Sequence, residues 1–178
     1  MSVAPPPGRH IVLIGLMGVG KTTIGRLLAA RLRWPLHDSD GEIEAREGAT
    51  VRELQERCGA DALHSLEAQV LLEALARAEP SVIAAAASTV EDERCEAALR
   101  AGGVTTVWLQ AKLATLVARY DSDPHRPRYP QGTAAALGEQ LAAREHRFAA
   151  VAKVTIDVDD LAPAEVLERL EGAIEEAG

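Results

Sequence analysis

Cysteine is scarce in this sequence. The 178 residues include two cysteines, Cys58 and Cys95, which are too few and too far apart for a zinc site or a disulfide scaffold. We interpret both as packing residues and expect the protein to work in a reducing cytoplasm. Long hydrophobic runs are also missing, because no apolar stretch approaches the ~20 residues that cross a bilayer. The sequence therefore argues against a disulfide-rich secreted protein and predicts no membrane span.

Basic residues are outnumbered by acidic ones. The net charge of −8 argues against a general affinity for nucleic acid or anionic membranes, so an anionic ligand must meet a local cluster of basic side chains. Residues 1–8 lack the apolar segment of a signal peptide, and their proline-rich end is typical of a disordered leader. Residues 9–178 are long enough for one domain with a sizeable core, and we expect a monomer.

A glycine-rich stretch is the most informative feature that is present. Residues 15–22 read Gly-Leu-Met-Gly-Val-Gly-Lys-Thr, follow the apolar run 10–14 and open an amphipathic helix. Such glycines let backbone N–H groups converge on a polyphosphate at the positive end of the helix dipole. Lys21 is then placed to reach the β- and γ-phosphates, and the Thr22 hydroxyl to bind Mg²⁺. We predict a nucleoside triphosphate site formed by Gly15, Met17, Gly18, Val19, Gly20, Lys21, Thr22 and Thr23.

Short apolar runs alternate with helical patterns along the rest of the chain. This alternation predicts an α/β fold of three layers, in which helices cover both faces of a five-stranded parallel sheet. Strands are expected at 10–14, near 34–37, and at 81–86, 104–110 and 153–158. Helices are expected from the glycine-rich loop to Pro35, along an apolar stripe from Leu63 to Leu75, and near 91–101, 112–120, 135–151 and 163–177. The proline-rich stretch 121–133 is expected to be functional or mobile.

Two carboxylates follow the second expected strand, at Asp38 and Asp40. Alternate residues of an extended segment point the same way, so both carboxylates are expected to face one site. One can organise the water shell of the metal ion, while the other orients a substrate hydroxyl and accepts its proton. The alternative is a helix N-cap, for which Ser39 or Asp40 is suited.

Arginines cluster around the irregular stretch. Arg126 and Arg128 lie within it, and Arg119 ends the preceding helix. Such arginines can close over the triphosphate, neutralise developing charge and exclude water, although a solvated arginine-rich loop is the alternative. On the next helix, Arg144 and Arg147 are candidates for binding an acidic substrate, because a guanidinium matches a carboxylate bidentately. One of these two can instead lie on the surface.

With these motifs the sequence resembles the shikimate kinase family of P-loop kinases, from about Ile11 to Ala164. The matching segments are 15–26, 38–44, Arg126 with Pro127, and Arg144 before Phe148. The resemblance implies ATP and Mg²⁺ as cofactors, and phosphoryl transfer to a hydroxyl of shikimate, a small acidic metabolite. It also implies the strand order 2-3-1-4-5, a substrate-binding helical region at about 41–70 and a mobile lid at about 121–133.

The same resemblance assigns roles to individual residues. It implies that Lys21, Thr22 and Asp38 hold the phosphates and the metal ion, and that Asp40 binds the substrate hydroxyl. It also implies that Arg119 stacks on the adenine and that Arg126 is the lid arginine. Arg144 would be one of two arginines that bind the substrate carboxylate. Lys21, Asp40 and Arg126 would then be the catalytic residues.

Two departures from the family pattern fall in the acceptor pocket. His64 stands where the family has the second carboxylate-binding arginine, and it lacks the bidentate fork of that arginine. Ala86-Ala87-Ser88 replaces a triple glycine, so each position adds a Cβ atom near the substrate. We expect His64, Ala86, Ala87 and Ser88 to line a reshaped acceptor site, although a helix-face histidine remains the alternative for His64.

Three hypotheses of function follow. The leading one is an ATP-dependent kinase that phosphorylates shikimate, with a kinase for another small hydroxylated or acidic metabolite as its close rival. A gluconate-kinase-like enzyme fits segment 38–44 less well. The third hypothesis is a non-catalytic nucleotide-binding regulator, against which the presence of both Asp40 and Arg126 argues, because nucleotide binding alone would not need both.

Overall fold

The computed structural model describes residues 10–123, 126 and 128–177. The expected leader, residues 1–8, lies outside the described residues, as do Pro124 and Pro127 of the expected lid. The strands are β1 His10–Ile14, β2 Leu36–Asp38, β3 Ser81–Ala84, β4 Val104–Gln110 and β5 Val154–Asp157. The helices are α1 Lys21–Leu32, α2 Ser39–Glu47, α3 Val51–Cys58, α4 Ala60–Leu75, the 3₁₀ helix η1 Ala87–Glu91, α5 Glu93–Leu99, α6 Leu113–Asp121, α7 Thr133–Val151 and α8 Pro163–Ala177.

The strands form one parallel sheet in the order β2-β3-β1-β4-β5, which confirms the expected order. Strand β1 lies at its centre, with His10 opposite Ser81 of β3 on one side and Val104 of β4 on the other. All five residues of β1 are buried, as is typical of a strand covered on both faces. Because all the strands run the same way, their carboxyl ends meet along one edge of the sheet.

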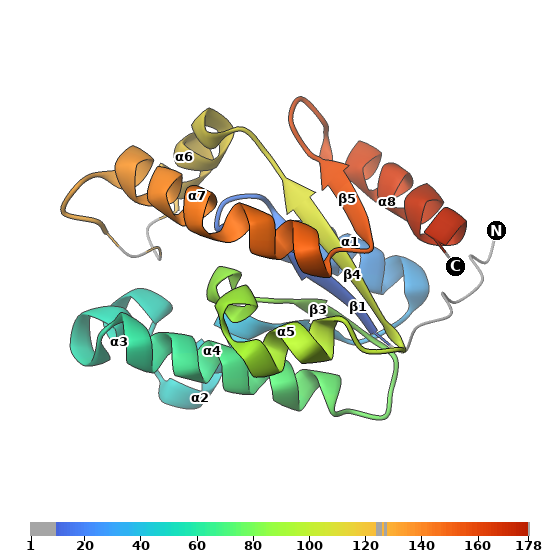
Figure 1. Cartoon of the computed structure of the whole chain (residues 1–178), viewed down its shortest axis with the longest axis horizontal. Helices are drawn as coiled ribbons and strands as arrows, with labels where there is room; N and C mark the ends of the chain where they lie inside the picture. The colour runs from blue at the N-terminus through green and yellow to red at the C-terminus, as the bar shows by residue number, and fades with distance from the viewer. Residues whose placement is uncertain (1–9, 124–125, 127, 178) are drawn as a thin grey trace.

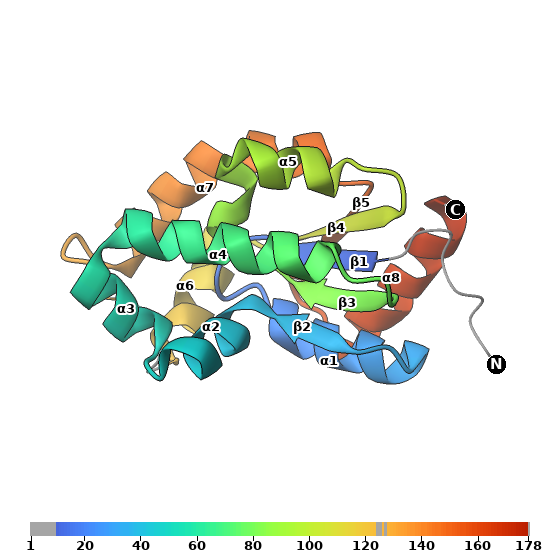
Figure 2. The ribbon, with the colours of Figure 1, turned by 90° about the horizontal axis from the view of Figure 1, so that it is seen from below.

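Helices cover both faces of this sheet (Figures 1 and 2). Helices α1 and α8 pack against each other on one face, and α4, α5 and α7 lie on the other face. The main core lies between these layers, with fully buried side chains such as Leu13, Leu28 and Phe148. The predicted α/β fold of three layers is therefore confirmed.

The region 41–70 comprises most of α2, all of α3 and the first part of α4. These helices share a small apolar cluster of their own, separate from the main core, formed by Ile43, Val51, Leu54, Leu63 and Val70. Helix α3 begins with a capping box, in which Thr50 and Glu53 satisfy each other's backbone N–H groups. In Figure 1 these helices lie together at one end of the molecule, beside the end of α7 that follows residue 132.

Three expectations from the sequence are wrong in detail. Cys58 is exposed at the end of α3, while only Cys95 is a packing residue. Strand β3 ends at Ala84 rather than at residue 86, because the chain turns there into η1. Helix α5 begins at Glu93 rather than near 91, because the Asp92 carboxylate caps it by accepting bonds from two backbone N–H groups.

Candidate active site

One cleft of about 640 Å³ opens along the carboxyl edge of the sheet. At one end it is lined by the glycine-rich loop and the start of α1, including Met17, Gly18 and Lys21. At the other end it is lined by residues of α4, by the segment that follows β3 and by α7, including His64, Ser88 and Arg144. The structure thus places the predicted acceptor residues in the same cleft as the predicted nucleotide residues, as expected at the ends of parallel strands. Gly15 and Val19 are the exceptions, because these two loop residues do not line the cleft.

The glycine-rich loop needs glycine for two reasons. Gly15 and Gly18 have φ angles of 140° and 87°, which side chains of L-amino acids rarely adopt. A Cβ atom at Gly15 would lie 2.4 Å from the Leu109 carbonyl oxygen, and one at Gly18 would lie 2.9 Å from that of Leu116. The first turn of α1 contains no acidic side chain, and its N-cap, Gly20, makes no side-chain capping bond. The N–H groups of that turn are therefore suited to binding an anion.

Lys21 lies over this loop. Its ammonium group donates hydrogen bonds to the carbonyl oxygens of Gly15 at 2.7 Å and Leu16 at 3.1 Å. Burial and, to a smaller extent, the nearby Arg126 cation lower the pKa of Lys21 to about 8. The side chain is still mostly protonated at pH 7, so it carries a positive charge to the place where phosphates would lie.

Thr22 and Asp38 are in direct contact. The Thr22 hydroxyl donates a hydrogen bond of 2.5 Å to Oδ2 of Asp38, which brings two oxygen ligands together beside the loop. The other oxygen, Oδ1, accepts from the Gly41 N–H at 3.3 Å, so Asp38 is the N-cap of α2. The alternative interpretation, a helix N-cap in this segment, is therefore correct. The predicted capping residue is wrong, because Asp38 caps the helix and not Ser39 or Asp40.

Asp40 contacts the predicted lid. Nη1 of Arg126 lies 3.0 Å from Oδ2 of Asp40, and Nε of the same arginine lies 3.1 Å from Oδ2 of Asp123. Arg119 contacts the glycine-rich loop, where its Nη1 donates to the Val19 carbonyl oxygen at 3.1 Å. All three predicted residues, Asp40, Arg119 and Arg126, line the cleft.

Arg144 and Arg147 differ in the exposure of their side chains and in their contacts. The Arg144 side chain is 7% exposed, and its Nε and Nη2 each lie 3.1 Å from a carboxylate oxygen of Glu91. Its Nη1 donates to Oε1 of Gln140 at 3.0 Å. Arg147 is 38% exposed and lies 3.9 Å from Glu96, outside the cleft lining. Arg144 is therefore placed to contact an acceptor, and Arg147 is the surface member of the pair.

His64 and residues 86–88 line the cleft together with Arg144. His64 is half-buried in the cleft lining, and burial, with the Arg144 charge as a smaller cause, lowers its pKa. Ala86, Ala87 and Ser88 also line the cleft, where they follow β3 as expected. The cleft placement favours the acceptor interpretation of His64 over that of a surface histidine.

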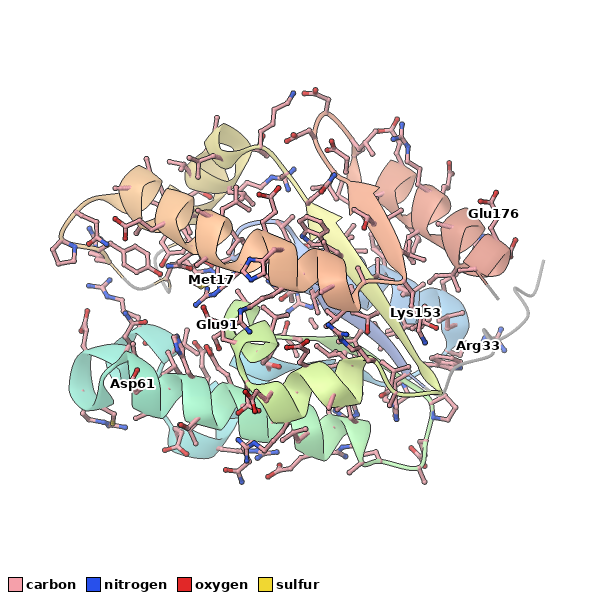
Figure 3. All side chains as sticks on the ribbon, in the orientation of Figure 1. Met17, Arg33, Asp61, Glu91, Lys153 and Glu176 are labelled. Atoms are coloured by element: carbon pink, nitrogen blue, oxygen red, sulfur yellow. The ribbon has the colours of Figure 1, made fainter. Side chains whose placement is uncertain are left out.

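Glu67 and Glu91 did not stand out in the sequence. Glu67 is 9% exposed, lies in the cleft lining and accepts a hydrogen bond from the Ser88 hydroxyl. Its burial raises its pKa to about 7. Glu67 follows Leu63 by one helical turn on the apolar stripe, and a carboxylate at such a position could have been predicted to be buried. Figure 3 labels Glu91, the last residue of η1, and no local pattern pairs it with Arg144 of α7.

Comparisons with known proteins agree with this geometry. The family model described as shikimate kinase matches residues 17–175. A shikimate kinase of Pseudomonas syringae pv. tomato is 38% identical over 91% of this chain and 96% of its own. One of Thermobifida fusca is 35% identical over 94% of this chain and 95% of its own. The solved structure of shikimate kinase from Acinetobacter baumannii in complex with shikimate has a TM-score of 0.88 at 28% identity, covering 98% of this chain and 95% of that one.

The chain belongs to the shikimate kinase family. It is therefore an ATP-dependent kinase, a phosphotransferase with the P-loop α/β fold of that family, and the predicted enzyme class is confirmed. No helix of the described residues is long and apolar enough to cross a membrane. In this chain, His64 and Ser88 line the cleft together with Arg144, and Arg144 is ion-paired with Glu91.

Proposed function

We propose that this chain transfers the γ-phosphoryl group of ATP to a hydroxyl of shikimate, forming shikimate 3-phosphate. The observation that carries the proposal is that one cleft holds Lys21 and the phosphate loop at one end and Arg144 at the other. A relative that covers most of this chain has been solved with shikimate bound. An acceptor hydroxyl positioned near Asp40 would lie between these two ends.

At the nucleotide end, each residue is proposed to act through charge or through backbone N–H groups. The loop cradles the phosphates, and Lys21 gives up its bonds to the loop carbonyls to bind the β- and γ-phosphate oxygens. Arg119, which lies beside the loop, contacts the adenine. Arg126 swings from Asp40 toward the transferring phosphoryl group, whose charge it neutralises.

The paired oxygens of Thr22 and Asp38 fit Mg²⁺. Both are hard ligands, and Mg²⁺ in kinase sites uses one or two protein oxygens together with phosphate oxygens and water. The described residues contain no cluster of three or more His, Cys, Asp or Glu that would suit a metal cage, which agrees with such a site. When bound, Mg²⁺ would supply charge neutralisation of the phosphates. Thr22 and Asp38 would hold it on the loop side of the cleft.

Asp40 is proposed as the residue that orients the acceptor hydroxyl and accepts its proton. Its carboxylate lines the cleft and, in the free enzyme, is paired with Arg126. Once Arg126 moves to the nucleotide, the freed oxygen can accept a hydrogen bond from the acceptor. Arg144, buried on α7, would hold the acceptor's carboxylate at the far end.

The rival acceptor hypothesis is supported by two residues. Ser88 donates to Glu67 at a place where the resemblance to the family implies glycine, and His64 cannot form the bidentate contact of an arginine. A different compact hydroxylated metabolite is therefore the second candidate. We further propose that the enzyme works as a monomer in the cytoplasm, where ATP and Mg²⁺ are available and where its free cysteines, Cys58 and Cys95, stay reduced.

An ADP-release assay with Mg·ATP tests the proposal. The acceptors would be shikimate, quinate, gluconate and nucleoside monophosphates, each at the same concentration. Shikimate-dependent ADP release with formation of a shikimate phosphate supports the proposal. Faster turnover of another acceptor would instead establish the second candidate, and ADP release with none of them would contradict both.

A further inference from the structure

Arg144, which lines the acceptor end of the cleft, is already paired with the carboxylate of Glu91, a residue outside the cleft lining. Glu91, the last residue of η1, occupies the Nε–Nη2 edge of Arg144 with both oxygens at 3.1 Å. Gln140 takes one N–H of Nη1. A substrate carboxylate must therefore bind the remaining edge of a guanidinium whose charge is partly offset by Glu91, a carboxylate that is itself 37% exposed.

The other charged groups do not restore a positive field there. Three other cations line the cleft among the described residues. Lys21 and Arg119 donate to carbonyl oxygens of the phosphate loop. Arg126 is paired with Asp40 and Asp123. His64 also lines the cleft. Burial and the nearby Arg144 charge lower its pKa, so it is a neutral imidazole at pH 7 and adds no charge. Glu67, bonded to Ser88, adds a carboxyl group to the cleft lining.

We propose that the Glu91–Arg144 ion pair balances the charge of the acceptor end, so that this enzyme phosphorylates uncharged polyhydroxylated rings about as well as the corresponding carboxylic acid. Glu91 is then the residue that sets the charge specificity of the acceptor. Removing its charge frees the guanidinium to attract an acceptor carboxylate, and it leaves an uncharged acceptor unaffected. The inference concerns acceptor choice and rests on the proposed phosphoryl transfer.

The test compares shikimate with its methyl ester, which has the same ring hydroxyls and no negative charge. We expect the wild type to use both with kcat/KM values within about tenfold of each other. Glu91→Gln keeps an oxygen that can accept from Arg144 but removes the charge, so we expect the acid-to-ester ratio of kcat/KM to rise by about tenfold, mainly through a lower KM for the acid. Glu96→Gln is the matched control, because Glu96 pairs with the surface residues Arg100 and Arg147.

Two kinetic results would overturn the inference. A wild type that prefers the acid by 100-fold or more would contradict charge balance. If Glu91→Gln raised the KM for the acid, Glu91 would be a positioning residue for Arg144 and not a competitor of the substrate. Should no acceptor support ADP release, the proposed function fails, but calorimetric titration of shikimate and its ester into wild type and Glu91→Gln still tests the charge argument on its own. Equal binding of the acid by both proteins would then reject it.

Discussion

The two ends of the cleft are built in different ways. The nucleotide end is a continuous segment, residues 15–22, whose backbone conformation creates the binding surface and whose Lys21 and Thr22 follow directly. The acceptor end is assembled from side chains of α4, η1 and α7, which pair with one another across 21 and 53 residues of sequence. A backbone surface tolerates little variation, whereas a side-chain surface changes with each substitution. This difference agrees with the expectation from the sequence that departures from the family pattern fall at the acceptor end.

The comparison predicts that a substitution at the nucleotide end causes the largest loss of kcat. Lys21→Ala removes a buried cation from the transferring phosphoryl group, so we expect kcat to fall by about 1,000-fold. Steady-state kinetics at saturating ATP and shikimate measure this loss. Lys112→Ala, on the residue that precedes α6 and does not line the cleft, is the control. Turnover unchanged in Lys21→Ala would mean that the loop does not bind the phosphates.

Asp40 lies between the two ends, and its replacement separates chemistry from nucleotide binding. We expect Asp40→Asn to lower kcat by about 100-fold, because the amide cannot accept the proton of the acceptor hydroxyl. The affinity for ATP, measured by calorimetry, should change little. An equal loss of ATP affinity would assign Asp40 to the nucleotide end.

At the acceptor end, Glu67 should make stability depend on pH. Its folded pKa of about 7 lies above the ordinary value of 4.5, so the folded state binds more protons between these values. The stability that the protonated carboxyl contributes is therefore complete below about pH 4.5 and is lost as the pH rises to about 7. The loss amounts to at most about 3 kcal/mol.

Glu67→Gln should remove this dependence, which urea unfolding at pH 5 and 7.5 measures. Relative to wild type, the variant should gain stability as the pH rises. Glu73→Gln on the same helix is the control, because the exposed Glu73 carboxylate pairs with Arg46 and its pKa is lowered. A gain in Glu73→Gln equal to that in Glu67→Gln would show that burial of Glu67 is not the cause.

The acceptor end should also respond to an added charge. We expect His64→Arg to lower the KM for shikimate by about tenfold, because a second guanidinium then faces the carboxylate held by Arg144. His146→Arg adds the same charge on the exposed surface of α7 and should leave the KM unchanged. No difference between the two variants would place His64 outside the carboxylate site.

The smallest expected effect is a pH dependence of nucleotide binding. Lys21 in the free enzyme has a pKa of about 8, so it loses its charge as the pH rises above that value. ATP prefers the charged form, and its apparent affinity should therefore weaken by several-fold between pH 7.5 and 9. Calorimetric titrations with ATP across this range test the expectation, and a flat profile would contradict the lowered pKa.

The sequence predicted the nucleotide end better than the acceptor end. A single local pattern was sufficient to predict strand β1, the loop and α1, and the alternation of apolar runs predicted all five strands to within a few residues. The ends of elements were less accurate. Asp92 caps α5 and Asp38 caps α2, and a cap depends on backbone angles that a list of residues does not contain.

The pairs at the acceptor end could not be predicted, because each joins residues with no common motif. Arg144 was recognised as a candidate, but its partner Glu91 was not, and Arg147 looked equally suitable until its exposure was known. Glu67 appeared as an acidic residue on an apolar stripe, and only the approach of Ser88 from η1 gives that carboxyl group its partner.

The sequence by itself determined the kind of chemistry. Glycines at fixed spacing before a lysine and a threonine leave the backbone few conformations, and those conformations bind phosphate. Tertiary structure alone decided the electrostatic character of the acceptor end, because charge at a buried site depends on which side chains meet there and how much water is excluded. Packing of η1 against α7 brings Glu91 to Arg144, and that contact exists only in the folded chain.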